Sequence, residues 1–241
     1  MSVFRSIVFS AVLAGIAVGI TITAVQSIGT IPLIQQAETY EKALGATHGH
    51  FMSEAVALES AAPAAANSHH AAEWEPADGF QRTSFTLGAN ILTAIGFSLL
   101  LGGAFTLRRH SVSWRDGMIW GLGGFVVFTV APGLGLPPEL PGMPVAELAA
   151  RQLWWFSTAA ATAAGICLLV FKRQPWAAGL GLALIVIPHL IGAPVVAAAH
   201  TDVPAALSHR FVVAVTLTSL VFWVLLGVST SVAVRRLSNG P

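Results

Sequence analysis

The chain has 241 residues, of which 55% are hydrophobic and only 10% are charged. A soluble domain carries roughly 25% charged residues, so the composition excludes an ordinary water-soluble globular protein. The single cysteine, Cys167, excludes a disulfide framework and a thiolate metal site. Basic residues come in pairs rather than in a patch, which argues against a nucleic-acid partner. The composition therefore predicts an all-α, polytopic bundle surrounded by membrane lipids.

The expected elements are about six transmembrane helices, because a span needs about 20 mainly apolar residues. The first expected helix follows Arg5 and is longer than a signal-peptide core, so we expect it to be retained. The chain is expected to form one transmembrane domain, residues 1–241, with a partly flexible outer loop over residues 35–82. Six segments qualify as spans: Ile7–Ile34, Thr83–Leu107, Gly117–Leu136, Gln152–Phe171, Pro175–Ala199 and Phe211–Val234.

The placement of lysine and arginine predicts the orientation of the bundle. With six spans and the N-terminus inside, only Asp116 among the acids falls on the inner side. Both termini are therefore expected in the cytoplasm. The outer side receives four basic residues: Lys42, Arg82, Arg151 and Arg210. The inner side receives Arg5, Arg108, Arg109, Arg115, Lys172, Arg173, Arg235 and Arg236.

The three helical hairpins share a pattern of helix-end residues. Each odd helix approaches its outer end with a proline that an acid follows six to eight residues later, and each even helix ends in a basic pair. The proline–acid pairs are Pro32 and Glu38, Pro132 and Glu139, and Pro194 and Asp202. The pattern indicates either three repeated hairpins around a common axis or ordinary residues of membrane helix ends.

The outer loop contains His48 and His50 among several carboxylates, including Glu38 and Glu41. Imidazole and carboxylate together suit divalent first-row metal ions. The spacing matches no zinc-finger pattern, so the loop is either a metal-capture segment or a solvated polar linker.

His189 follows Pro188 inside an otherwise apolar run, about 21 Å along its predicted helix. Ionisable residues inside a membrane are costly and are candidates for function. Proline also removes a backbone hydrogen bond and releases a carbonyl. His200, eleven residues later, and His209 are further candidates; the alternative for each is a histidine that bonds to a neighbouring helix.

Glu139 lies among five prolines between Pro132 and Pro144, in a segment that is expected to be stiff and non-helical. It is either a metal ligand at the mouth of a pathway or an ion-pair partner of Arg151, Arg82 or Arg210. Gln26 and Asn90 are polar residues within expected spans, and such residues either join helices or line a pore.

The sequence contains no phosphate-binding loop, no H-E-x-x-H zinc-protease motif and no G-x-S-x-G nucleophile elbow. We therefore expect no enzymatic activity.

Several separated motifs together resemble one known family. These are AVQSIGTIPLIQQAETYE, EWEPADGFQRT, GLPPELPGM with ARQLWW, and IPHLIGAP, and they cover nearly the whole chain. They resemble the CbtA-type subunits of proposed bacterial cobalt transporters, a family described with about five spans. The resemblance implies cobalt uptake linked to cobalamin production in a bacterial inner membrane, with a small single-span CbtB-type partner that supplies a histidine-rich segment.

The working hypothesis is a membrane subunit for uptake of a divalent metal ion. Co²⁺, or alternatively Ni²⁺, is the transported substrate, and no cofactor is required. The rival hypotheses are a non-catalytic scaffold of a larger complex and a haem- or quinone-binding membrane protein. The candidate metal ligands are His189, Glu139, Glu38, Glu41, His200, Asp202, His209, His48 and His50.

Overall fold

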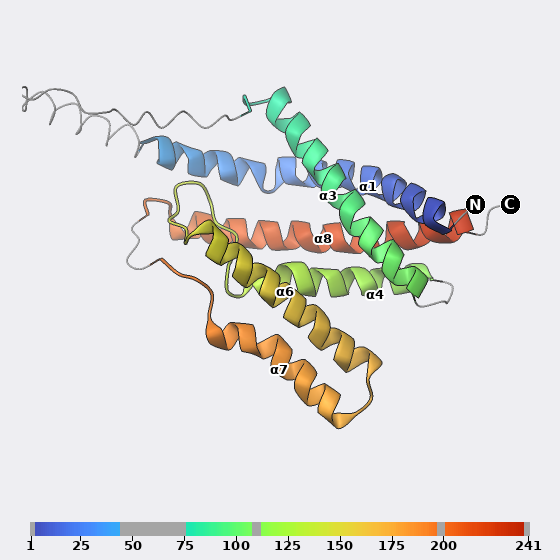
Figure 1. Ribbon diagram of the computed structural model, residues 1–241. Coiled ribbons are helices and arrows are strands. Elements are labelled where there is room, and N and C mark those ends of the chain that lie inside the picture. Colours follow the sequence, from blue (N-terminus) through green and yellow to red (C-terminus); the bar gives the residue numbers. More distant parts are fainter. Residues whose placement is uncertain (1–2, 44–75, 108–111, 197–200, 239–241) are drawn as a thin grey trace, which may run out of the picture.

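The computed structural model describes residues 3–43, 76–107, 112–196 and 201–238, and these residues form helices and no strands (Figure 1). This confirms the predicted all-helical class. The elements in chain order are α1 (Val3–Ile28), a helical segment over residues 31–43, α3 (Phe80–Leu107), α4 (Trp114–Phe125), a π-helical turn η1 (Val126–Val130), α5 (Ala131–Gly133), α6 (Leu148–Phe171), α7 (Pro175–Ile191) and α8 (Ala205–Ser238).

Four helices of the described chain are long and apolar enough to cross a membrane: α1, α3, α6 and α8. The shorter α7 and the continuous run α4–η1–α5 lie beside them, and together the helices make six alternating passes (Figure 1). The start of α1 and the end of α8 consequently lie at the same end of the bundle, as expected for an even number of passes.

Two of the expected helices end six to eight residues earlier in the structure. The first helix ends at Ile28, and a turn at Gly29 and Thr30 precedes the helix that contains Pro32. The fifth ends at Ile191 rather than Ala199, because Gly192 adopts a φ of 87° that ends the helix. The helices α3, α4, α6 and α8 each start three to six residues earlier than expected.

The bundle consists of a central group and a peripheral pair. Helix α8 packs against α1, α3 and α4, and α1 packs extensively on α3. Helix α7 packs chiefly on α6, and α6 meets the central group through η1 and α5. Of the three consecutive hairpins, the first therefore forms a closely packed pair, whereas α7 and α8 lie apart.

Glycines allow the closest helix contacts. A Cβ at Gly227 of α8 would lie 2.0 Å from the carbonyl oxygen of Gly117 of α4. A Cβ at Gly181 of α7 would lie 2.9 Å from the carbonyl oxygen of Gly165 of α6. In a bilayer, helices gain little from hydrophobic burial against each other, so such backbone contacts supply much of the packing energy.

Polar side chains join the central helices. Asn90 of α3 donates to Gln26 Oε1 at 2.7 Å and to Thr23 Oγ1 at 2.9 Å, both on α1. The buried hydroxyls of Ser98 and Thr230 join α3 to α8 at 2.6 Å. Gln26 and Asn90 thus join helices, which confirms one of the two alternatives predicted for them.

The π-helical turn η1 has a covalent cause. Pro132 has no N–H to donate to the carbonyl of Phe128, and its ring crowds that carbonyl. The helix widens, and the N–H of Ala131 instead reaches the carbonyl of Val126. The widened turn places Phe128 on the ring of Trp223 of α8, with centroids 5.4 Å apart and an interplanar angle of 7°.

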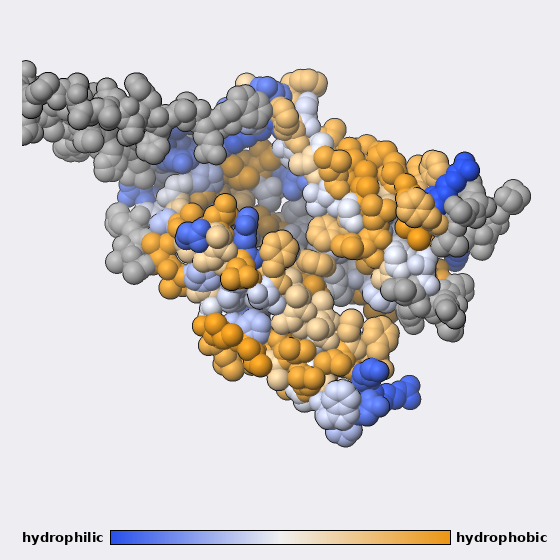
Figure 2. All heavy atoms as spheres, viewed as in Figure 1, coloured by the Kyte–Doolittle hydropathy of each residue, from blue (hydrophilic) through white to orange (hydrophobic). Residues whose placement is uncertain are grey.

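Hydrophobic side chains cover the middle of the visible face, and hydrophilic residues gather at both ends (Figure 2). Large apolar residues such as Leu92, Leu153 and Leu190 are each at least 70% exposed, an arrangement that suits a lipid surround and not water. The structure and the composition therefore agree on a membrane-embedded bundle.

Candidate functional site

The candidate site lies at the bundle end opposite the start of α1. Helix 31–43, the proline-rich segment after α5, and the start of α8 meet there (Figure 1). Thr201 donates to the carbonyl of Gly142 at 3.2 Å, and a Cβ at Gly142 would lie 3.3 Å from the Cβ of Glu41. A buried apolar cluster fixes the three segments together: Leu33, Ala37, Leu140, Val203, Leu207 and Phe211.

Arg82, in the first turn of α3, binds two of the acids at this end. Its guanidinium pairs with Glu38 from helix 31–43 and with Asp78, whose oxygen lies 2.9 Å from the Arg82 nitrogen. The Glu38 side chain is only 17% exposed, compared with 72% for Asp78. Glu38 is therefore a shielded carboxylate whose charge is compensated by a neighbouring helix.

Arg151, in the first turn of α6, binds Glu139 at 2.6 Å. The structure therefore shows the ion-pair alternative that was predicted for Glu139, with Arg151 as the partner. The buried Arg151 Nε has no hydrogen-bond acceptor among the described residues. A hollow of about 270 Å³ beside the pair is lined by Pro138, Gln152 and Trp155 as well as by Arg151.

His189 lies in the last turn of α7. It contacts Trp154 of α6, which is one helical turn after Arg151. Its ring meets the edge of Trp154 with centroids 5.9 Å apart. Trp154 Nε1 donates to the carbonyl of Pro188 at 3.3 Å, which also accepts from the N–H of Gly192 at 3.1 Å. The half-buried imidazole has no hydrogen bond within the described chain, so both ring nitrogens stay available to a ligand.

The other candidate ligands are distributed more loosely. Glu41, Asp202 and His209 are exposed at the same end. His48, His50 and His200 lie outside the described residues.

In the described ranges, no three His, Cys, Asp or Glu side chains form a group that could hold a metal ion. The structure therefore brings Glu38, Glu139 and His189 to one end of the bundle without forming a coordination sphere from them. Glu38 and Glu139 each lie against an arginine instead.

Three functional-site neighbours were not identified from the sequence. Glu147 caps α6: its carboxylate accepts from the N–H groups of Ala149 and Ala150 at 2.9 and 2.8 Å. These bonds hold the pKa of Glu147 below its ordinary value. Trp154 and the buried Thr158 occupy the α6 face toward α7. An acid directly before an apolar run was a usable signal for the cap.

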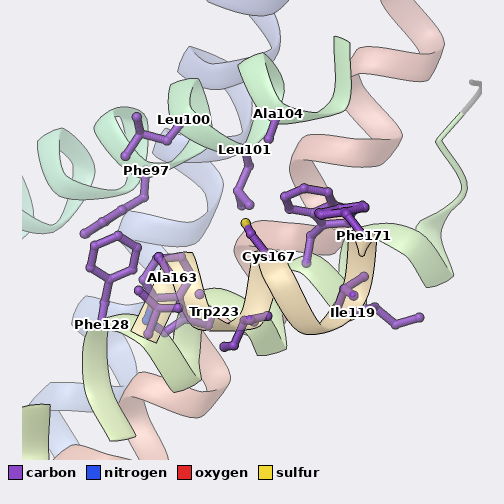
Figure 3. A pocket seen from close by; sticks show the side chains of 16 residues that line it. Phe97, Leu100, Leu101, Ala104, Ile119, Phe128, Ala163, Cys167, Phe171 and Trp223 are labelled. Carbon is purple, nitrogen blue, oxygen red and sulfur yellow. The ribbon is translucent and has the colours of Figure 1, made fainter. Parts of the chain in front are cut away.

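A larger groove elsewhere in the bundle differs chemically from this end. A hollow of about 360 Å³ opens between α3, α4 and α6, and nearly all of its lining is apolar (Figure 3). Phe97 and Phe128 line one part of it, Phe171 another, and the Cys167 sulfur points into it. Apart from the single Cys167 thiol, the side chains that line this groove offer a hydrated cation no ligands in exchange for water, so the groove is not a candidate metal site.

The opposite end of the bundle is basic. Asp116, the one acid at this end among the described residues, belongs to a capping box with Ser113 at the start of α4. Arg115 lies over the ring of Trp114 at 5.4 Å, and Arg5 over that of Phe9 at 5.7 Å. Charged groups are therefore segregated between the two ends as the sequence predicted.

A comparison with family models matches residues 4–235, nearly the whole chain, to the family described as "Probable cobalt transporter subunit (CbtA)". The chain belongs to the CbtA family. No curated protein and no solved structure matches it. Family membership agrees with the resemblance that the separated motifs indicate, and it connects the helical membrane bundle to cobalt transport.

Proposed function

We propose that this CbtA-family chain is the membrane subunit through which Co²⁺ enters the cell, with Ni²⁺ as the alternative substrate. The observation that carries the proposal is that two shielded carboxylates and an unpartnered imidazole lie at the same end of an otherwise apolar bundle. Co²⁺ accepts imidazole nitrogen and carboxylate oxygen as ligands. The family description supports cobalt as the transported ion.

In this proposal the carboxylates act as exchangeable partners. Arg82 and Arg151 neutralise Glu38 and Glu139 while no metal ion is near. Both pairs are partly exposed, and the free energy of such pairs is small, so an arriving divalent ion competes with the arginine at modest cost. The outer-loop histidines His48 and His50, with Glu41 and Asp202, would raise the local metal concentration before that exchange.

His189 then receives the ion. Its ring lies at the C-terminal end of α7, where the helix carbonyls carry partial negative charge that favours a cation. Trp154 fixes the position of the adjacent Pro188 carbonyl. The imidazole therefore sits at the boundary between the polar end and the apolar span, where a metal ion must exchange water for protein ligands.

We further propose that the basic end faces the cytoplasm, in a bacterial inner membrane, and that both termini are cytoplasmic. Inward movement of a divalent ion gains about 4.6 kcal/mol per 100 mV of membrane potential, at ~2.3 kcal/mol per charge. ATP is then not required. The uptake would supply cobalamin synthesis, and a small single-span CbtB-type subunit would deliver metal to the outer end.

The test is uptake of radioactive cobalt by cells that express this chain, with and without the candidate small partner. His189→Ala should abolish the uptake and leave membrane insertion intact. Leu190→Ala is the matched control, because Leu190 is the exposed neighbour of His189 on α7 and its side chain has no atom that could bind a metal ion. Undiminished uptake by the His189 variant would remove His189 from the pathway, and the absence of any uptake by the wild-type chain with its partner would contradict the function.

A further inference from the structure

The interface between α6 and α7 contains polar atoms that neither the metal candidates nor the helix contacts account for. Thr158 and Thr162 of α6 are 0% and 1% exposed, and neither hydroxyl has a hydrogen-bond partner within the described residues. A buried hydroxyl without a partner is destabilising, because it has lost its hydrogen bonds to water, so two of them one turn apart call for an explanation.

Helix geometry places both threonines on or beside the face of α6 that packs on α7. Trp154 and Gly165 of α6 each touch α7, through the carbonyl of Pro188 and through Gly181. Residues spaced three or four apart lie on one helix face. Thr158 and Thr162 fall between these two contacts on the same face, and Figure 1 shows α6 and α7 side by side along this stretch.

The same stretch of α7 has a carbonyl without its helical donor. Pro188 has no N–H, so the carbonyl of Leu184, four residues earlier, receives no intrahelical hydrogen bond from it. Pro188 is buried on the side toward α6. The Leu184 carbonyl points along the helix toward Pro188. It therefore lies at the level of the two threonines, about one turn further into the span than His189.

These three oxygens have no nearby acid. The spans α6 and α7 contain no carboxylate, and their one arginine, Arg151, lies at the outer end. The Born cost of transferring an ion rises with the square of its charge, so an uncharged oxygen site suits a monovalent ion far better than a divalent one. Carbonyls freed in broken membrane helices bind sodium ions in other transporters.

We infer that Thr158, Thr162 and the Leu184 carbonyl form a site for a dehydrated Na⁺ in the α6–α7 interface. The ion supplies a partner for the two hydroxyls and takes the place of the N–H donor that Pro188 cannot offer to the Leu184 carbonyl. It also ties α6 to α7 one turn from His189, so its occupancy controls the position of Trp154 against Pro188. The binding site is independent of the cobalt cargo; only its role in coupling Na⁺ to metal uptake rests on the proposed function.

The test measures the unfolding midpoint of the purified full chain in NaCl, KCl and choline chloride at equal ionic strength. Wild-type protein should show saturable stabilisation by Na⁺ alone. Thr158→Val and Thr162→Val keep the side-chain shape without the hydroxyl, and each should raise the half-saturating Na⁺ concentration roughly tenfold. Pro188→Ala, which restores an N–H donor to the Leu184 carbonyl, should weaken binding as well.

Ser157→Ala is the matched control, because Ser157 is an exposed neighbour on α6 that bonds only within its own helix. It should keep the full Na⁺ response. A wild-type midpoint that is equal in the three salts would overturn the site, whether or not the variants fold. So would a full Na⁺ response in a monodisperse double threonine variant.

Cobalt uptake separates this inference from the proposed function. If the wild-type protein takes up cobalt but its unfolding midpoint does not respond to Na⁺, the Na⁺ site is overturned and the metal function stands. Na⁺ stabilisation without any cobalt uptake supports the site and contradicts the metal function.

Discussion

At the scale of single residues, Glu147 shows how one side chain sets the start of a span. It accepts two N–H groups of the first turn of α6, which would otherwise be unpaired. The same turn carries Arg151, the partner of Glu139. The cap therefore also fixes the position of an ion pair in the candidate site.

We predict that Glu147 makes the stability of the protein depend on pH in the acid range. Its pKa lies below the ordinary value of 4.5 because the ionised carboxylate accepts backbone hydrogen bonds. The stabilisation is complete above pH 4.5 and is lost as the pH falls through the lowered pKa. Thermal midpoints of wild-type protein and Glu147→Ala in detergent, measured between neutral and acid pH, should converge at the acid end.

Glu147→Asn is the control, because asparagine caps helices well and does not titrate. It should keep most of the stability at neutral pH and lose the dependence on acid pH. A Glu147→Ala curve that runs parallel to the wild-type curve at every pH would contradict the role of the cap.

The ion pairs of the site show where prediction from sequence stops at this scale. Arg151 was one of three expected partners for Glu139, and its identity follows from the local path of the proline-rich segment. Arg82 and Glu38 are 44 positions apart. Their meeting depends on how helix 31–43 packs, and apolar periodicity carries no information about that contact.

At the scale of elements, glycine contacts hold the helices at distances that larger residues prevent. The α4–α8 contact is the closest, with Gly117 and Gly121 of α4 against Gly227 and Trp223 of α8. Gly117 and Gly121 are both buried, whereas Gly103 of α3 has open space around its Cβ position. The effect of a substitution can therefore be compared between a packed and an unpacked glycine of the same chain.

We predict that Gly227→Ala destabilises the bundle by about 1–3 kcal/mol, the usual cost of overpacking. The added methyl group must displace the backbone of α4, since it would lie 2.0 Å from the Gly117 oxygen. Gly103→Ala should cost nothing, because alanine favours helices and meets no neighbour there. Thermal unfolding in detergent measures both, and equal midpoints for the two variants would contradict the packing argument.

Helix existence was more predictable than helix ends. Long apolar runs without charges specify spans because a bilayer leaves few alternatives to a helix. The end of α7 at Ile191 had a local signal in Gly192 followed by Pro194, which the length of the apolar run concealed. The π-helical turn before Pro132 follows from the missing N–H of that proline, whereas the separation of α7 from α8 results from packing between helices.

At the scale of the whole molecule, charge and topology agree. The helices alternate in direction, and the end of the bundle with Arg115, Arg235 and Arg236 lies opposite the end with Glu38 and Glu139 (Figure 1). Peripheral packing of the α6–α7 pair also means that the candidate pathway residues His189 and Arg151 belong to the part of the bundle with fewest attachments. A change in that pair can alter the site without unfolding the central helices.

The orientation is testable because the chain has a single native cysteine, Cys167. In a Cys167→Ala background, Ala205→Cys at the carboxylate-rich end should react with a membrane-impermeant maleimide in intact cells. Lys172→Cys, at the opposite end, should react only after the membrane is opened. Ala205 and Lys172 are both exposed and flank spans, so their accessibility differs only through the side on which they lie.

The physical reason for the expected result is that arginine and lysine near span ends are retained on the cytoplasmic side. Labelling of Lys172→Cys in intact cells, with Ala205→Cys protected, would reverse the bundle and place the acids and His189 on the side of metal release rather than metal capture.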